Sequence, residues 1–209
     1  LATVRSDANA MARNVATAVT YGPEHPYGEI ATEESLRKVD IGRIQDYYNT
    51  YFRPNVAYMV VVGDITAERA RHLLEHYFSA WEPAEVPRHN YPTPQPPPGR
   101  RVAFAERAGA IQSVVTVTYP VQLSPGHPDA IKASVMNTIL GGSFTSRLMQ
   151  NLREDKGYTY GARSSLSTDR LVGRFTAGTE VRNSVTDSTL VEIFSEMQRL
   201  IEEPIDPED

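Results

Sequence analysis

The sequence predicts an α+β protein of two lobes, with antiparallel sheets and packed helices, and three observations support this class. Residues 112–119 alternate apolar and polar side chains, which is the period of a half-buried strand. Residues 158–167 and 171–180 have strand-like composition and are joined by a polar turn, so they predict an antiparallel hairpin. Apolar residues recur every three or four positions in residues 66–81 and 184–201, which indicates amphipathic helices.

The boundary between the lobes is predicted from proline. Seven of the 15 prolines fall within residues 83–99. Because proline removes a backbone donor and fixes φ, this stretch is expected to be an extended connector. The lobes are therefore expected at residues 1–82 and 100–209.

The first lobe is predicted to hold three helices, a loop and one buried strand. The strand is an apolar, largely β-branched run after Pro54-Asn55, and Gly63-Asp64 ends it. The helices are predicted at residues 6–20, 41–52 and 66–81, the loop at 21–28 and the strand at 56–62.

The second lobe is predicted to begin with two strands and to end with a helix. Gly141-Gly142 interrupts one helix, and Lys156-Gly157 turns the chain before the hairpin. The strands before the hairpin are predicted near residues 101–106 and 112–119, and the helices at 130–140, 145–154 and 184–201.

Composition excludes several classes of protein. With 40% apolar and 22% charged residues, the 209-residue chain is neither disordered nor fibrous, and no apolar run is long enough to span a membrane. The net charge of −5 and the scattered basic residues give no support to a nucleic-acid partner. Since there is no cysteine, disulfides and thiolate metal sites are excluded, while cytoplasm and periplasm both stay open.

The ends of the chain suggest a fragment. It starts at Leu1 rather than at a methionine and enters a helix-like stretch almost at once. It stops in a segment typical of a turn and helix start. We therefore expect a piece of a longer protein.

One motif matches a metal site. His72-Leu73-Leu74-Glu75-His76 has the spacing of inverted zincins, in which two histidines bind zinc and the glutamate acts as general base. At about 100° per residue, however, both histidines fall opposite the apolar face of their helix. We expect them to face water, although Glu154 stays open as a third ligand. His25 and His89 are expected at the surface, and His127 in a structural turn.

A second segment carries a family resemblance. Residues 140–161 contain Leu-Gly-Gly, Ser-Arg-Leu, Leu-Arg-Glu and Gly-x-x-Tyr in that order, and the run resembles the C-terminal domain of the pitrilysin/insulinase family of zinc metallopeptidases. The resemblance covers nearly the whole chain. The other matching motifs are His25-Pro26-Tyr27-Gly28, Tyr51-Phe52-Arg53-Pro54-Asn55, Val61-Val62-Gly63-Asp64 and Tyr77-Phe78-x-x-Trp81.

This resemblance implies a mitochondrial processing peptidase-like metallopeptidase fold and two site residues. Relatives have an arginine and a tyrosine, seven residues apart, that reach across to the substrate, and they match Arg153 and Tyr160. The alternatives are a helix-end pairing of Arg153 with Glu154 or Asp155, and a core strand aromatic at Tyr160.

Residues 141–143 precede this pair. Gly141, Gly142 and Ser143 are assigned to substrate binding, since glycine lets a peptide backbone approach closely. The simpler alternative is a turn with positive φ between two helices.

The resemblance also implies a function. The chain is expected to be the substrate-binding, non-zinc half of a zinc-dependent metalloendopeptidase and to be inactive alone. Zinc would be held outside this chain, by an N-terminal half or a partner subunit, and the substrate would be a peptide. The alternative is a non-catalytic or structural subunit of the same family.

Overall fold

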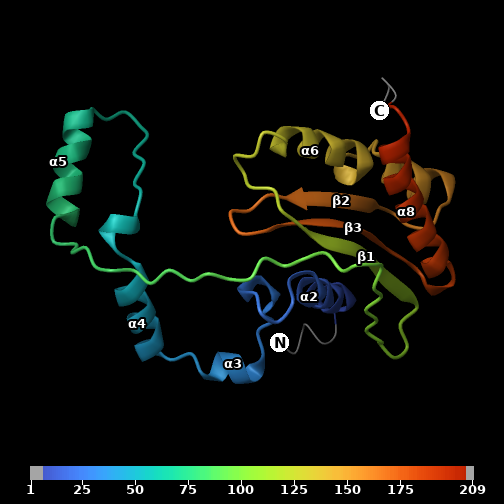
Figure 1. Ribbon diagram of the computed structural model, residues 1–209, viewed down its shortest axis with the longest axis horizontal. Coiled ribbons are helices and arrows are strands. Elements are labelled where there is room, and N and C mark those ends of the chain that lie inside the picture. Colours follow the sequence, from blue (N-terminus) through green and yellow to red (C-terminus); the bar gives the residue numbers. More distant parts are fainter. Residues whose placement is uncertain (1–6, 206–209) are drawn as a thin grey trace. The chain divides into compact units, whose positions relative to one another are not determined.

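The computed structural model describes residues 7–205, and its centre is a three-stranded antiparallel sheet (Figure 1). Its strands lie in the order β1–β3–β2. Because β3 pairs with both neighbours, the predicted hairpin and the predicted strand at 112–119 are confirmed. The strands are β1 (Gln112–Val121), β2 (Ala162–Ser167) and β3 (Gly173–Arg182).

One face of the sheet carries the hydrophobic core. On β3, Phe175, Ala177 and Val181 are buried, and the register places Tyr119 of β1 opposite Phe175. Side chains alternate between the two faces of a strand, so these residues share one face. Ile193, which is fully buried on a helix after β3, packs into the same cluster. The helical elements that follow β1 are α6 (Ala130–Asn137), η3 (Thr138–Gly142), α7 (Arg147–Met149), η4 (Gln150–Asp155) and, after β3, α8 (Thr186–Glu202).

The opposite face of the sheet is polar and is covered by α2 (Ala8–Tyr21). The hydroxyl oxygens of Thr20 on α2 and Thr118 on β1 lie 2.8 Å apart. Arg174 on β3 donates from Nη1 to Oγ1 of Thr17 at 3.1 Å. Side-chain hydrogen bonds therefore join α2 to β1 and to β3, across 98 and 157 residues of the sequence.

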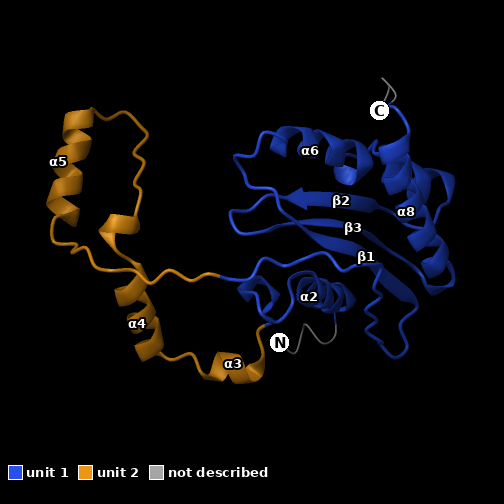
Figure 2. Cartoon of the chain, in the orientation of Figure 1, with its two compact units in different colours: residues 1–30, 91–209 blue, residues 31–90 orange. Residues whose placement is uncertain are grey.

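The chain divides into two compact units, which Figure 2 distinguishes by colour. One unit contains residues 1–30 and 91–209, and the other contains residues 31–90. The two units do not coincide with the two lobes predicted from the prolines. The reason is that α2, near the start of the chain, packs on the sheet formed by residues 112–182. The assignment of residues 1–82 and 100–209 to parts of two peptidase domains stays a prediction.

The second unit, residues 31–90, is helical in the structure. The predicted buried strand at 56–62 is wrong: the segment has no strand pairing, and Tyr58, Val60 and Val62 are 99%, 84% and 91% exposed. A strand needs a neighbouring strand for its hydrogen bonds, and the described residues supply none here. The helices of this unit are α3 (Glu33–Arg37), α4 (Ile41–Tyr51), the 3₁₀ turn Pro54–Val56 and α5 (Ala67–Phe78).

The predicted strand at 101–106 is also wrong, since the segment is unpaired and its Val102 and Phe104 are exposed. The α+β class is confirmed, but the described residues form a sheet only in the first unit. None of the described helices combines the length and the hydropathy needed to cross a membrane.

His25 differs from its prediction as a surface residue, because it is only 3% exposed. Its ring contacts the rings of Tyr21, Tyr27 and Tyr91, with centroids 4.8–5.8 Å away. Its Nδ1 accepts a hydrogen bond from the backbone nitrogen of Tyr27 at 3.1 Å. Two nearby tyrosines and one from a distant part of the chain therefore surround this loop histidine.

Candidate functional site

An open pocket of about 690 Å³ lies at the end of the sheet where β1 begins and β3 ends. Its lining includes the arginine and the tyrosine that the sequence singled out, Arg153 and Tyr160. The full lining is Gln112, Arg153, Glu154, Gly157, Tyr158, Thr159, Tyr160, Gly161, Glu180 and Arg182.

Arg153 comes from η4, a π-helical segment, and is half-buried. Its Cζ lies 4.8 Å from the centroid of the Phe144 ring, a cation–π distance. Its Nε lies 3.2 Å from Oε1 of Glu154, so the alternative of a helix-end ion pair is also present. A guanidinium has five donors, and this pairing through Nε leaves Arg153 able to donate to a ligand in the pocket.

Tyr160 follows a sharp turn at the end of η4. Gly157 has φ +60°, which glycine adopts without strain, and its backbone nitrogen donates to the carbonyl of Arg153 at 3.2 Å. The predicted turn at Lys156-Gly157 is thus confirmed. The next backbone nitrogen, that of Tyr158, donates to the carbonyl of Leu152 at 2.9 Å. These two bonds reverse the chain after η4, so that the segment carrying Tyr160 starts beside Arg153.

Hydrogen bonds from β3 hold the loop that carries Tyr160. The Oγ1 of buried Thr179 lies 2.8 Å from both Oγ1 of Thr159 and the carbonyl oxygen of Gly161. Tyr160, between these two anchored residues, is 97% exposed. The alternative of a core strand aromatic is therefore wrong, and the phenol is displayed to solvent at the pocket.

Gly141, Gly142 and Ser143 do not line this pocket. A Cβ on Gly141 would collide with the backbone nitrogen of Ser164 on β2, so this glycine permits close packing of η3 on the sheet. Neither glycine has positive φ, which removes the turn conformation considered for them. Their assignment to substrate binding, with Ser143, stays a prediction.

The histidines of α5 face solvent, as their helical spacing predicts. His72 and His76 are both exposed. Within residues 7–205, no group of three or more histidine, aspartate or glutamate side chains is arranged to hold a metal ion. Among these residues, no third side chain joins His72 and His76 in the kind of group that holds zinc.

Sequence reasoning missed three pocket residues. Gln112 and Arg182 are partners in the β1–β3 register, and Glu180 lies on the same strand. The Nδ2 of Asn9 on α2 donates to Oε2 of Glu180 at 3.4 Å. Strand register alone brings these side chains beside Arg153, and no local pattern in the sequence reveals that register. Phe144 packs on Arg153, and apart from its position close to Gly142 no feature of the sequence predicts this contact.

Comparison with known proteins identifies the family. Residues 38–209 match the family described as the peptidase M16 inactive domain. The chain belongs to this family. The match includes β1, β2, β3, α8 and the whole lining of the pocket.

Two curated relatives have names that point in different directions. The chain is 27% identical over 143 residues to an uncharacterized zinc protease YmxG of Bacillus subtilis, covering 68% of this chain and 33% of the relative. It is 24% identical over 131 residues to a non-peptidase homolog YmxG of Helicobacter pylori, covering 63% and 30%. The chain thus spans about a third of the length of these relatives.

Solved structures share the fold. A peptidase M16 inactive domain from Pseudomonas fluorescens aligns with a TM-score of 0.85 at 20% identity, covering 99% of this chain and 50% of that protein. The periplasmic protease PqqL of Escherichia coli aligns with a TM-score of 0.78 at 13% identity, covering 99% and 23%. At these identities the likeness concerns the fold.

Proposed function

We propose that this chain is the substrate-binding, non-zinc half of a zinc-dependent metalloendopeptidase that cleaves peptides or unfolded protein segments. The observation that carries the proposal is that Arg153 and Tyr160 line one open pocket. Membership of the M16 family and a relative named as a zinc protease support the same class of reaction.

The two side chains fit complementary tasks in amide hydrolysis. Arg153 would donate N–H bonds to carbonyl oxygens of an extended peptide, because a guanidinium presents several donors in a rigid plane. The hydroxyl of Tyr160 would donate a hydrogen bond to the oxyanion that develops on the scissile carbonyl. Its exposure leaves that hydroxyl available to a ligand.

The zinc ion does not fit the residues described here, since they offer no three-ligand group. Under this proposal the ion is held by residues outside the chain, in another part of the polypeptide or in a partner subunit. The chain alone is then expected to be inactive.

The test uses the complete protein with its zinc-bearing part. Tyr160→Phe is expected to lower kcat about 100-fold, corresponding to the loss of one oxyanion donor of ~3 kcal/mol, with little change in KM or zinc content. Arg153→Ala is expected to raise KM for long peptides. Tyr77→Phe, at another exposed tyrosine, is the matched control and should leave turnover unchanged. Full turnover in Tyr160→Phe would remove this residue from the mechanism.

A second candidate is a non-catalytic or structural subunit of the same family, favoured by the relative named as a non-peptidase homolog. Zinc analysis and peptide cleavage by the complete protein, alone and with its partner, separate the two. A protein that binds no zinc and cleaves nothing in either state supports the second candidate.

A further inference from the structure

The π-helical segment η4 that carries Arg153 is joined to α8 by a cluster of polar side chains. Nδ2 of Asn151 donates to Oε1 of Glu196 at 2.7 Å and to Oε2 of Glu192 at 3.0 Å. Because a side-chain amide has two N–H groups on one atom, Asn151 can serve both carboxylates at once. One residue of η4 therefore bridges two successive turns of α8.

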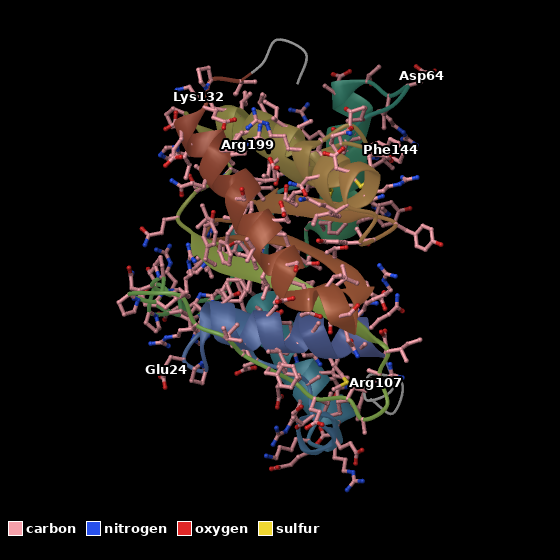
Figure 3. The ribbon with its side chains drawn as sticks, turned by 90° about the vertical axis from the view of Figure 1, so that its right-hand side faces the viewer. Glu24, Asp64, Arg107, Lys132, Phe144 and Arg199 are labelled. Carbon is pink, nitrogen blue, oxygen red and sulfur yellow. The ribbon has the colours of Figure 1, made fainter. Side chains whose placement is uncertain are left out.

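Two cations complete the cluster. Nη1 of Arg199 lies 3.1 Å from both carboxylate oxygens of Glu196, and Nζ of Lys156 lies 3.2 Å from Oε1 of Glu192. Figure 3 shows α8 and labels Arg199 on it, and it also labels Phe144, which lies in the turn between η3 and α7. We name these five residues the α8 clamp: Asn151, Lys156, Glu192, Glu196 and Arg199.

Glu196 is unusual because its carboxylate is almost wholly buried: the residue is 2% exposed. A buried charge is costly unless it is paired and hydrogen-bonded. Asn151 and Arg199 together pair and hydrogen-bond the carboxylate of Glu196. Burial of this carboxylate is therefore tolerated only while η4 lies against α8. The hydrogen bond from Asn151, followed by Lys156, also holds the pKa of Glu192 below its usual value.

The π-helical winding explains why Asn151 and Lys156 both reach α8. The backbone nitrogen of Lys156 donates to the carbonyl of Asn151 at 3.0 Å, a bond across five residues. This wider winding brings the two residues nearer to one face of the segment, whereas in an α-helix they would lie about 140° apart. Arg153, two positions after Asn151, then points away from α8, because residues two apart do not share a helix face.

We infer that Asn151 and Glu196 are positioning residues, which through the α8 clamp aim the guanidinium of Arg153 into the pocket against Phe144. The clamp fixes η4 on both sides of Arg153, at Asn151 and at Lys156, while fully buried Leu152 anchors the segment in the core. This role rests on the proposed function only where peptide cleavage is concerned. The placement of Arg153 can be tested without it.

The first experiment observes Arg153 directly in the complete protein. The Nε–Hε resonance of Arg153, assigned with Arg153→Lys, should carry a ring-current shift because the guanidinium lies over Phe144. Asn151→Ala is expected to move this resonance toward the value of a free arginine. Gln150→Ala, at the exposed neighbour outside the clamp, should leave it in place. Glu196→Gln serves as a second variant should Asn151→Ala fail to fold. An unmoved resonance in a folded clamp variant overturns the inference.

The second experiment measures peptide cleavage in a double-mutant cycle. Asn151→Ala is expected to lower kcat/KM about 10- to 100-fold, as for other losses of active-site alignment, and to cause no further loss in an Arg153→Ala background. Losses that simply multiply would overturn the inference, since the clamp would then act elsewhere. If Arg153→Ala itself leaves cleavage unchanged, the proposed function is rejected and the resonance alone decides the positioning role.

Discussion

Gly141 and Tyr160 illustrate how the same short segment places one residue for packing and another for solvent. Gly141 is buried where η3 packs against β2, and even a methyl group there would overlap the backbone of Ser164. Tyr160 is exposed because Thr179 holds the residues on either side of it rather than its own side chain. Local sequence suggested importance at both positions, but only the contacts separate the two roles.

Gly141→Ala should therefore destabilise the protein. The added methyl group must push η3 away from β2, and overpacking of this kind costs about 1–3 kcal/mol. Thermal or denaturant unfolding of the complete protein measures the change. Gly99→Ala is the control, because a Cβ at Gly99 has nothing within 4 Å. Equal stability of the two variants would contradict this account of Gly141.

At the scale of elements, a segment forms its predicted structure only where it finds a partner. The alternating run of β1 finds β3, whereas the more apolar run at 56–62 finds no strand in the described residues. η4 likewise takes its π-helical course beside α8, to which the clamp joins it.

The clamp predicts a pH dependence of stability. The amide of Asn151 and then the ammonium of Lys156 lower the pKa of Glu192 from its usual 4.5. A carboxyl whose folded pKa is lowered stabilises the fold above its unfolded pKa, and this contribution is lost as the pH falls through the folded value. Glu192→Gln should thus lower Tm at pH 6, and the difference from wild type should shrink between about pH 4.5 and 3.

At high pH the stability contribution of Lys156 has the opposite pH dependence to that of Glu192. Glu192 raises the pKa of Lys156, so the ion pair weakens only above the lysine's usual pKa of 10.5. A Tm difference between Glu192→Gln and wild type that stays constant from pH 6 to 3 would show that this ion pair is not linked to folding.

The exposed run at 56–62 predicts a difference in backbone protection. In this chain alone, its amides should exchange with deuterium rapidly, because the segment has no ladder hydrogen bonds. In the complete protein, we expect slow exchange if additional strands pair with it. Mass spectrometry of the peptide covering residues 56–62 in the two proteins makes the comparison. Equal, rapid exchange in both would show that the segment never joins a sheet.

At the scale of the whole molecule, stability is divided unequally between the two units. All the buried hydrophobic residues of the core lie in residues 1–30 and 91–209. Residues 31–90 have helices with caps, but none of their side chains is fully buried. Since burial of apolar surface supplies most of the folding free energy, residues 31–90 are expected to open first.

Limited proteolysis of this chain tests that order. Trypsin should cleave first within residues 31–101, for example after Lys38, Arg71 and Arg88, and later within the sheet. The peptide containing α2 should remain bound to residues 112–202 after cleavage, because Thr17 and Thr20 join it to Arg174 and Thr118. Release of that peptide on the first cut would contradict the packing of α2 on the sheet.

The sequence by itself determined the α+β class, the hairpin, the amphipathic helices and the glycine turn at Gly157, and it singled out Arg153 and Tyr160 as the candidate site pair. These features depend on local periodicity, turn chemistry or family motifs, which are readable along the chain. Only the tertiary structure decided that α2 covers the sheet, that His25 is buried, that 56–62 is unpaired and that Glu196 is clamped to Asn151. Each of these depends on residues far apart in the sequence, and the free energy of such contacts exists only once the chain has brought them together.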